Sequence, residues 1–288
     1  ASRDVISRAA QTEINEGRGI DGCVLLDLRH LGKELIQTKL SYINEVAMDF
    51  ANVNLAEHPI PIRPGNHYEM GGIKTDINGS TPIPGLYAAG ECACVSIHGG
   101  NRLGANSLLD TIVFGRRSGE VAAHYAQKAA EHSTSESSVS ADREMIRDLL
   151  RRKPNGDTVA KIRLAMGQTM NENVAVFRNE DGMQNALNTI RQLKERYTTL
   201  AVQDKGKVYN TNLIFTLELG FMLDAAEVIC VSGLARKESR GAHYRTDIPE
   251  RDDVNWLKHI LVSTTTHGLH IDYSPVTITH WTPQARSY

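Results

Sequence analysis

The chain has 288 residues, a length that suits one large or two modest domains and leaves room for a buried core. Its formal net charge is −2, so no basic excess indicates a nucleic-acid surface, and we expect no nucleic-acid partner. No apolar run approaches the roughly 20 residues that a membrane-spanning helix needs.

The N-terminal part of the chain predicts short helices and strands. Residues 2–16 predict a helix, because Ser2 can serve as its N-cap and apolar residues recur along it. Residues 24–28 predict a strand, and residues 31–50 predict a helical stretch. The proline-rich segment 59–64 predicts extended backbone, since a residue that precedes proline disfavours the helical conformation.

Residues 90–109 form a glycine-rich segment, GECACVSIHGGNRLGANSLL, that runs into an apolar helix. Glycines let the backbone approach a ligand closely, because no Cβ stands in the way. The start of a helix offers unpaired N–H groups and a partial positive charge. Arg102 can hold a carboxylate through two parallel hydrogen bonds. The segment therefore predicts a site for an anionic ligand, with a polar cofactor group nearby.

Glu91 lies at the entrance to this segment. Residues 83–91 predict a turn, then a short buried strand, then a tight turn at Gly90 and Glu91. A carboxylate just after a strand is well placed to accept hydrogen bonds from a ribityl or ribose hydroxyl. A solvated loop carboxylate is the alternative interpretation of Glu91.

The cysteines do not indicate a metal site. Cys92 and Cys94 are separated by one residue, which is neither a zinc-knuckle nor a redox C-x-x-C spacing. Cys23 and Cys230 lie far from this pair in the sequence. We expect reduced thiols and no metal site.

The second half of the chain predicts helices followed by a small β region. A helix from Ser107 to about residue 130 presents an apolar core face, which comprises Leu108, Leu109, Ile112, Val113 and Phe114. Residues 131–141 are rich in Ser, Thr and Glu and predict an exposed linker. Three or so helices follow between residues 141 and 236, and the apolar positions from Leu213 to Ile229 indicate helix-bundle packing.

The C-terminal end predicts a β hairpin. Residues 256–262 and 269–280 alternate as strands do, and Gly268 lies in the turn between them. Before the hairpin, residues 236–243 form a charged cluster. This cluster predicts either a structural role or a partner-facing surface, and its charges could also form a solvated face.

Five segments resemble, in order and spacing, the succinate dehydrogenase and fumarate reductase flavoproteins, a family that also includes L-aspartate oxidase. They are ASRDV at residues 1–5, HYEMGGI at 67–73, the glycine-rich segment at 90–109, ARKESRGAH at 235–243 and RDDVNW at 251–256. The resemblance covers essentially the whole chain. It implies an α+β fold with four regions: part of a substrate-capping domain (1–58), the C-terminal part of an FAD-binding domain (59–130), a helical domain (131–240) and a small β region (241–288).

The resemblance also implies a dicarboxylate site. His67 matches the histidine that hydrogen-bonds one substrate carboxylate, and Arg102 matches the arginine that clamps a carboxylate beside the flavin ring. Arg3 matches the arginine assigned as the proton donor to fumarate or acceptor from succinate. A guanidinium is a poor acid near neutrality, so this role requires desolvation, neighbouring cations and a proton relay. The family relay includes a glutamate outside this sequence.

Four residues match the family's FAD contacts. Glu91 corresponds to the glutamate that accepts hydrogen bonds from the ribityl or ribose hydroxyls. Ser107 and Leu108 correspond to the helix-start residues whose backbone contacts the pyrimidine edge of the flavin, and Asn106 lies in the same turn. His98 is left with two interpretations, because it could orient the substrate or support the loop.

The implied activity is the FAD-dependent interconversion of succinate and fumarate. Electrons would pass to an iron-sulfur subunit and a membrane quinone, with membrane anchor subunits as indirect partners. The protein would be peripheral, on the cytoplasmic face of the inner membrane or the mitochondrial matrix side. The family carries a dinucleotide-binding unit with G-x-G-x-x-G at its N-terminus, whereas this sequence has no such motif set between a strand and a helix near its beginning. We therefore expect the C-terminal part of a longer flavoprotein, whose N-terminal portion is a further partner.

Two other functions stay open. L-aspartate oxidase shares the Arg-Asp start, the His-Tyr segment and the glycine-rich core, but the segments at residues 251–253 and 256–259 look more like the dicarboxylate reductases. Alternatively, the chain alone is a non-catalytic fragment that acts through its helical region as an interaction module.

Overall fold

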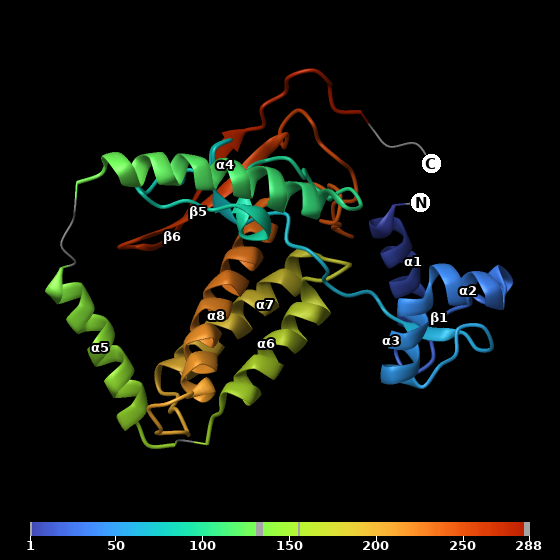
Figure 1. Ribbon diagram of the computed structural model, residues 1–288, viewed down its shortest axis with the longest axis horizontal. Coiled ribbons are helices and arrows are strands. Elements are labelled where there is room, and N and C mark those ends of the chain that lie inside the picture. Colours follow the sequence, from blue (N-terminus) through green and yellow to red (C-terminus); the bar gives the residue numbers. More distant parts are fainter. Residues whose placement is uncertain (1, 131–134, 155, 285–288) are drawn as a thin grey trace. The chain divides into compact units, whose positions relative to one another are not determined.

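The computed structural model describes residues 2–130, 135–154 and 156–284. The chain separates into an N-terminal unit that ends at His67 and a C-terminal unit that begins at Tyr68. Helices and small two-stranded sheets make up both units, so the predicted α+β fold class is confirmed (Figure 1). The predicted division into four regions stays a prediction.

The N-terminal unit combines helices with one antiparallel pair of strands. Its elements are α1 (Arg3–Asn15), β1 (Val24–Leu26), η1 (Arg29–Leu31), α2 (Lys33–Lys39), α3 (Ser41–Ala51) and β2 (Ile60–Ile62). Strands β1 and β2 pair so that Val24 lies opposite Ile62. Its buried core is a cluster of Ile36, Ala47 and Leu55. The predicted helix at the start of the chain and the extended proline-rich segment are thus confirmed.

The first part of the C-terminal unit brings two distant segments together. Strand β3 (Ile73–Lys74) pairs in parallel with β4 (Ala93–Cys94), and the short helix η2 (Gly90–Cys92) directly precedes β4. The segments can approach because Gly72 has no side chain: an added Cβ would lie 2.5 Å from the carbonyl oxygen of Cys92. A loop then leads to the long helix α4 (Asn106–Lys128).

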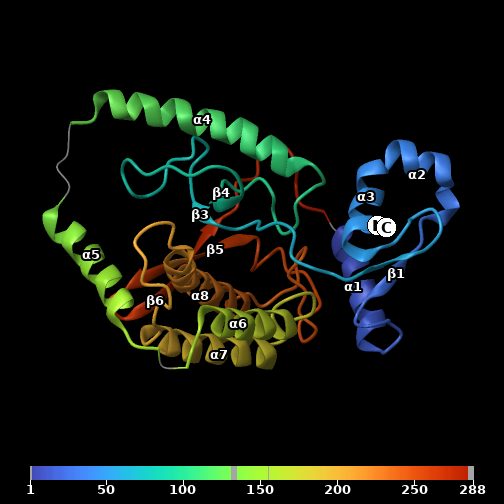
Figure 2. The same cartoon turned by 60° about the horizontal axis from the view of Figure 1, so that its bottom comes forward.

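Four helices form the middle of the C-terminal unit: α5 (Glu136–Arg151), α6 (Val159–Asn173), α7 (Glu180–Thr198) and α8 (Thr211–Ala235). Helices α6, α7 and α8 pack side by side (Figure 1 and Figure 2). Side-chain oxygens of Thr158, Asn179 and Asn210 cap the starts of these three helices. The apolar stripes face inward and bury a core of Ile162, Met166, Ile190, Leu193, Leu200, Leu219, Leu223 and Ala226.

A β hairpin follows the helices, as predicted. Strands β5 (Lys258–Thr265) and β6 (Gly268–Pro275) are antiparallel, and Thr265 pairs with Gly268 at the turn. Gly268 has φ +104°, a backbone conformation that residues other than glycine rarely adopt. The hairpin packs through β5 against the end of α8.

Two local predictions are wrong. The expected linker at residues 131–141 is wrong for residues 136–141, which belong to α5, a helix that carries an apolar stripe. Residues 131–134 lie outside the described part of the chain. The strand expected within residues 83–91 is reduced to a single bridge between Ser80 and Tyr87.

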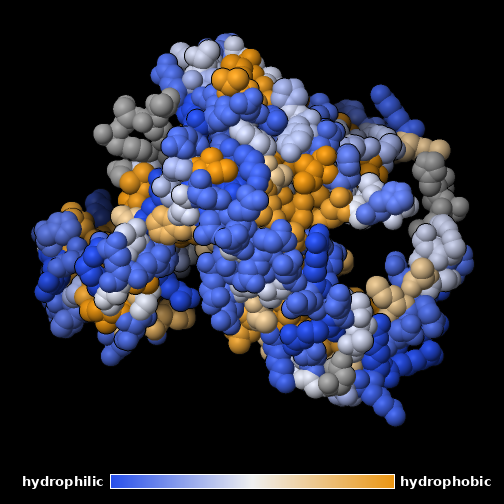
Figure 3. Space-filling model, turned by 180° about the vertical axis from the view of Figure 1, so that it is seen from behind, coloured by the Kyte–Doolittle hydropathy of each residue, from blue (hydrophilic) through white to orange (hydrophobic). Residues whose placement is uncertain are grey.

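The predicted core face of α4 is largely exposed. Leu108, Leu109 and Ile112 have 67%, 60% and 69% of their surface accessible. Apolar surface is visible between the hydrophilic regions of the molecule (Figure 3). Helical periodicity alone does not reveal whether a partner covers an apolar face.

Within residues 2–130, 135–154 and 156–284, no helix is long and apolar enough to cross a membrane. No group of three or more His, Cys, Asp or Glu that could hold a metal ion is found in the same residues.

Candidate functional site

Arg102 lies in the loop between β4 and α4. Its guanidinium carbon is 4.6 Å from the centre of the Tyr68 ring, and Nη1 donates a hydrogen bond to the carbonyl oxygen of Leu103 at 3.0 Å. Its Nε atom is buried and has no hydrogen-bond partner among the described residues. A buried unpartnered donor costs about 1–3 kcal/mol, and a bound anion would remove that cost.

Tyr68, which lies under Arg102, and His98 share one carboxylate oxygen of the buried Asp110. The hydroxyl of Tyr68 donates to Oδ2 of Asp110 at 3.0 Å, and Nε2 of His98 lies 3.2 Å from the same oxygen. The side chains of His98 and Asp110 are only 5% and 1% exposed. Burial, followed by the hydrogen bond to Asp110, raises the pKa of Tyr68 to about 12, so the hydroxyl keeps its proton.

Asn106 fixes the orientation of His98. Its side-chain nitrogen lies 3.4 Å from Nδ1 of His98 and can only donate, so Nδ1 accepts and Nε2 carries the proton. The imidazole therefore donates to Asp110 and supports the loop from within. Of the two interpretations of His98, the geometry favours support of the loop over contact with a substrate.

In the first turn of α4, the backbone N–H groups of Asn106 and Leu108 donate to the carbonyl oxygens of Leu103 and Ala105 at 3.2 and 3.1 Å, which leaves the N–H of Ser107 without a backbone partner among the described residues. Ala105, the residue before the helix, has φ +61°, and no side chain caps the helix start. Ser107 is half-buried and its carbonyl accepts a hydrogen bond from Thr111 at 2.9 Å, whereas Leu108 is exposed. An uncapped helix start favours a ligand that carries negative charge.

Glu91 lies in η2 and is exposed. Its Oε1 atom accepts a hydrogen bond from the backbone N–H of Glu69 at 2.9 Å, which anchors the carboxylate. In the described part of the chain no residue hydrogen-bonds its other oxygen. An anchored carboxylate with one open oxygen is suited to accept a hydrogen bond from a hydroxyl group, and because Glu91 is exposed, its interpretation as a solvated loop carboxylate stays open as well.

Two of the predicted site residues belong to the other unit. Arg3 is exposed in the first turn of α1, and His67 is exposed at the end of the N-terminal unit. Arg102 lies in the C-terminal unit. The structure does not determine the positions of the two units relative to one another, so the convergence of these three residues stays a prediction.

Sequence reasoning missed two members of the site, Tyr68 and Asp110. Asp110 interrupts the apolar start of α4, and a single carboxylate among apolar residues was the available signal. Tyr68 directly follows His67, and its position in the same short motif was the corresponding signal.

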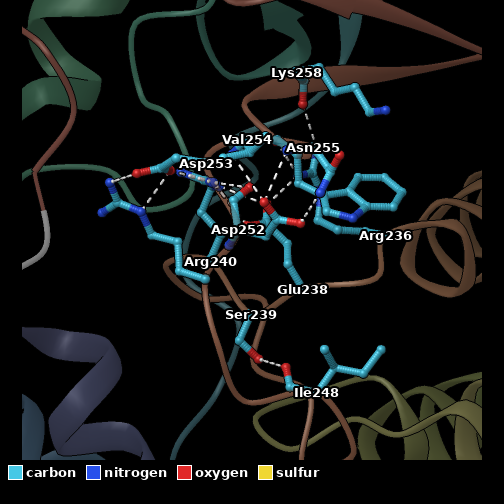
Figure 4. Close-up of polar contacts among 12 residues, drawn as sticks. Arg236, Glu238, Ser239, Arg240, Ile248, Asp252, Asp253, Val254, Asn255 and Lys258 are labelled. Atoms are coloured by element: carbon cyan, nitrogen blue, oxygen red, sulfur yellow. Dashed lines mark hydrogen bonds and ion pairs between the residues drawn. The ribbon is translucent and has the colours of Figure 1, made fainter.

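The charged cluster at residues 236–243 is centred on the buried Glu238, with Arg236, Arg240 and His243 half-buried and Lys237 exposed, so its interpretation as a solvated face is wrong for all but Lys237. Glu238 is fully buried and pairs with Arg236 at 2.6 Å and Arg240 at 2.7 Å (Figure 4). The backbone N–H of Asp252 donates to the second oxygen of Glu238 at 2.9 Å. The two cations and the N–H satisfy the carboxylate in its buried position.

His243 ends this cluster and meets Arg178. Nη1 of Arg178 donates to Nδ1 of His243 at 3.0 Å, while Nε2 of His243 is buried without a hydrogen-bond partner in the described residues. Burial, followed by the charge of Arg178 and of two further arginines, lowers the pKa of His243 to about 3. The imidazole is therefore neutral in the folded protein near neutral pH.

Comparisons with known proteins match the whole chain. The family model described as "Fumarate reductase flavoprotein C-term" matches residues 163–288, and the one described as "FAD binding domain" matches residues 1–108. The fumarate reductase flavoprotein subunit of Mycobacterium tuberculosis is 45% identical over 99% of this chain and 51% of that protein. The succinate dehydrogenase flavoprotein subunit of Rickettsia conorii is 42% identical over 99% of this chain and 50% of that protein.

A solved quinol fumarate reductase from Escherichia coli has the same fold. It matches with a TM-score of 0.92 at 41% identity, over 98% of this chain and 50% of that chain. The chain spans about half the length of these relatives.

Proposed function

Because the chain belongs to the fumarate reductase and succinate dehydrogenase flavoprotein family, we propose that it forms part of an FAD-dependent enzyme that interconverts succinate and fumarate. The observation that carries the proposal is Arg102, whose buried Nε has no partner while its ring contact with Tyr68 fixes the guanidinium. Such a group is prepared to bind a carboxylate.

The residues of the C-terminal unit fit an FAD molecule. Asn106, Ser107 and Leu108 form the uncapped start of α4, where the N–H of Ser107 and the partial positive charge of the helix would face the electron-rich pyrimidine edge of a flavin. Glu91 would accept a hydrogen bond from a flavin hydroxyl through its open carboxylate oxygen. Bound FAD would supply the hydride acceptor for succinate, or the hydride donor for fumarate.

A C4 dianion needs cationic or N–H donors at both ends. Arg102 would hold one carboxylate and His67 the other, so that the bond between the two central carbons is fixed in one orientation. Charge drawn into a held carboxylate makes the double bond of fumarate a better hydride acceptor. Arg3 would then deliver the proton to fumarate, or receive it from succinate.

The proposal includes further chains. The relatives are named flavoprotein subunits, so this protein would pass electrons to an iron-sulfur subunit and then to a membrane quinone. Its attachment to the membrane would be peripheral, through anchor subunits that it does not itself contact. The exposed apolar residues of α4 would be covered by the remaining part of the flavoprotein, which the relatives contain and this chain does not span.

Replacement of Arg102 tests the proposal. In the complete flavoprotein, Arg102→Ala should lower kcat/KM for succinate-dependent dye reduction by at least about 100-fold, because a charged hydrogen-bond donor to the substrate is lost. Arg117→Ala, which removes an exposed guanidinium from α4, is the matched control and should change kcat/KM less than about 3-fold.

The same assay separates the competing activities. Near-wild-type turnover of succinate by the Arg102 variant would contradict the assigned role. Turnover of L-aspartate in place of succinate by the wild type would identify an L-aspartate oxidase. Loss of both activities in a wild-type protein that holds FAD would favour the non-catalytic interpretation.

A further inference from the structure

The loop that carries Arg102 contacts the C-terminal part of the chain as well as α4. The carbonyl oxygen of Gly100, two residues before Arg102, accepts a hydrogen bond from the backbone N–H of Ala242 at 2.9 Å. Residues 240–243 form a tight turn in which Arg240 and His243 exchange two backbone hydrogen bonds, at 2.8 and 3.1 Å. This turn is the half-buried C-terminal end of the charged cluster described above.

Two glycines allow the loop and the turn to meet. Gly241 has φ +60°, and an added Cβ would collide with the carbonyl oxygen of Gly100. Conversely, a Cβ on Gly100 would lie 3.0 Å from Cγ and 3.1 Å from the carbonyl oxygen of Arg240. Backbone therefore touches backbone at this point, and neither side has room for a side chain.

The turn itself is held rigidly. Arg240 pairs with the buried carboxylate of Glu238 at 2.7 Å and with Asp253 at 2.8 Å (Figure 4). The hydroxyl of Ser239 hydrogen-bonds the carbonyl oxygen of Ile248 at 2.7 Å. Because Glu238 and Ser239 are buried and all these groups are paired, the turn acts as a fixed support for the loop.

A second contact reaches the other end of the loop. Oγ of Ser96 lies 2.8 Å from Nε2 of His259 in strand β5. Ser96 has φ +74°, a conformation that a non-glycine residue keeps only where its surroundings enforce it. The C-terminal part thus holds the loop before and after His98.

We propose that the turn at residues 240–243, together with His259, positions the Arg102 loop for binding a dicarboxylate. Gly241 is then a positioning residue, since it acts on Arg102 through Gly100 and touches no substrate itself. The inference rests on the proposed function. It means that the C-terminal part of the chain influences substrate affinity through the Arg102 loop.

Gly241→Ala in the complete, FAD-loaded flavoprotein tests the inference. The added methyl group must displace Gly100, and a shift of about 1 Å at Arg102 is enough to cost up to about 100-fold in a positioned reaction. We expect at least a 10-fold rise in the dissociation constant of malonate, a non-reacting dicarboxylate, measured from the flavin absorbance change. KM for succinate should rise by a similar factor.

Gly268→Ala is the matched control. Gly268 also has a positive φ, so the substitution introduces backbone strain in the same unit, but an added Cβ there meets nothing within 4 Å. This variant should bind malonate within 2-fold of the wild type. The thermal midpoint of each variant shows how far either substitution affects stability alone.

Ser96→Ala keeps the inference testable if the Gly241 variant does not fold. It removes only the hydroxyl that meets His259, and a rise of at least 3-fold in the malonate dissociation constant is expected. Wild-type malonate affinity in either folded variant, with only the thermal midpoint lowered, would overturn the inference. A wild-type protein that holds FAD but responds to neither malonate nor succinate would overturn the proposed function, and the inference with it.

Discussion

Arg102 and Asp110 both touch Tyr68, and each keeps one buried atom without a partner. Arg102 lies over the ring of Tyr68, while Asp110 accepts a hydrogen bond from the Tyr68 hydroxyl. Among residues 2–130, 135–154 and 156–284, neither Nε of Arg102 nor Oδ1 of Asp110 has a hydrogen-bond partner. A buried polar group without a hydrogen-bond partner lowers the stability of a folded protein. The two unpartnered atoms therefore mark the place where a ligand would complete the network.

Asp110 is the central acceptor of this network, so its removal should destabilise the fold. In Asp110→Ala, the hydroxyl of Tyr68 and the N–H of His98 lose their shared acceptor in a buried place. We expect the free energy of unfolding, measured with urea, to fall by about 1–3 kcal/mol. Glu120→Ala, on the exposed side of the same helix, should change it by less than about 0.5 kcal/mol. Equal losses in both variants would contradict the central role of Asp110.

At the residue scale, the sequence singled out Arg102 and Glu91 as ligand-binding candidates, which stay predictions, but it did not single out the side chains that contact Arg102. Arg102 and Glu91 stand out because glycines surround them. Tyr68 and Asp110 could not be paired from the sequence, since 42 positions separate them and only the pairing of β3 with β4 brings their segments together. Residues in the N-terminal unit, such as Arg3, stay predictions.

His243 couples two elements, because it joins the turn after α8 to Arg178 in the segment before α7. Its pKa is lowered to about 3 in the folded protein, so the unfolded chain binds one more proton between that pH and the ordinary histidine pKa of about 6.5. The contribution of His243 to stability is therefore fully present above pH 6.5 and is lost as the pH falls toward 3.

Urea unfolding at several pH values tests this coupling. Between pH 6.5 and 4, His243 should steepen the loss of stability by at most about 1.4 kcal/mol per pH unit, and His243→Gln should remove that part of the slope. His267→Gln, in the exposed turn of the hairpin, controls for loss of an imidazole and should leave the slope unchanged. A His243 variant with the wild-type slope would show that the imidazole is not buried in a neutral form.

At the element scale, periodicity predicted most helices and the hairpin, and it failed where pairing decides the outcome. Helix α5 begins in a Ser- and Glu-rich stretch because its apolar residues lie further along, beyond the expected linker. The burial of the charged cluster could not be predicted, because one partner of Glu238 is the backbone N–H of Asp252, which lies 14 positions away in a separate motif. Long-range partners, and not local propensity, determine whether such charges are buried.

At the scale of the whole molecule, the chain spans about half the length of its relatives and exposes apolar residues along the start of α4. Contiguous apolar surface of this kind marks a contact with another part of a protein or with a partner. The loop after η2, the first turn of α4 and this apolar face are adjacent in the sequence. A segment that covers the face would therefore also border the proposed flavin site.

Ile112 provides the test of this arrangement, because it is 69% exposed here and should be buried in the complete flavoprotein. There, Ile112→Ala should lower the free energy of unfolding by about 2 kcal/mol or more, as expected for a buried isoleucine. Leu164→Ala on α6 removes a side chain that is 74% exposed, and should cost no more than about 0.5 kcal/mol. If the two substitutions had equally small effects, the start of α4 would face solvent in the complete protein too, and its apolar residues would need a partner subunit to cover them.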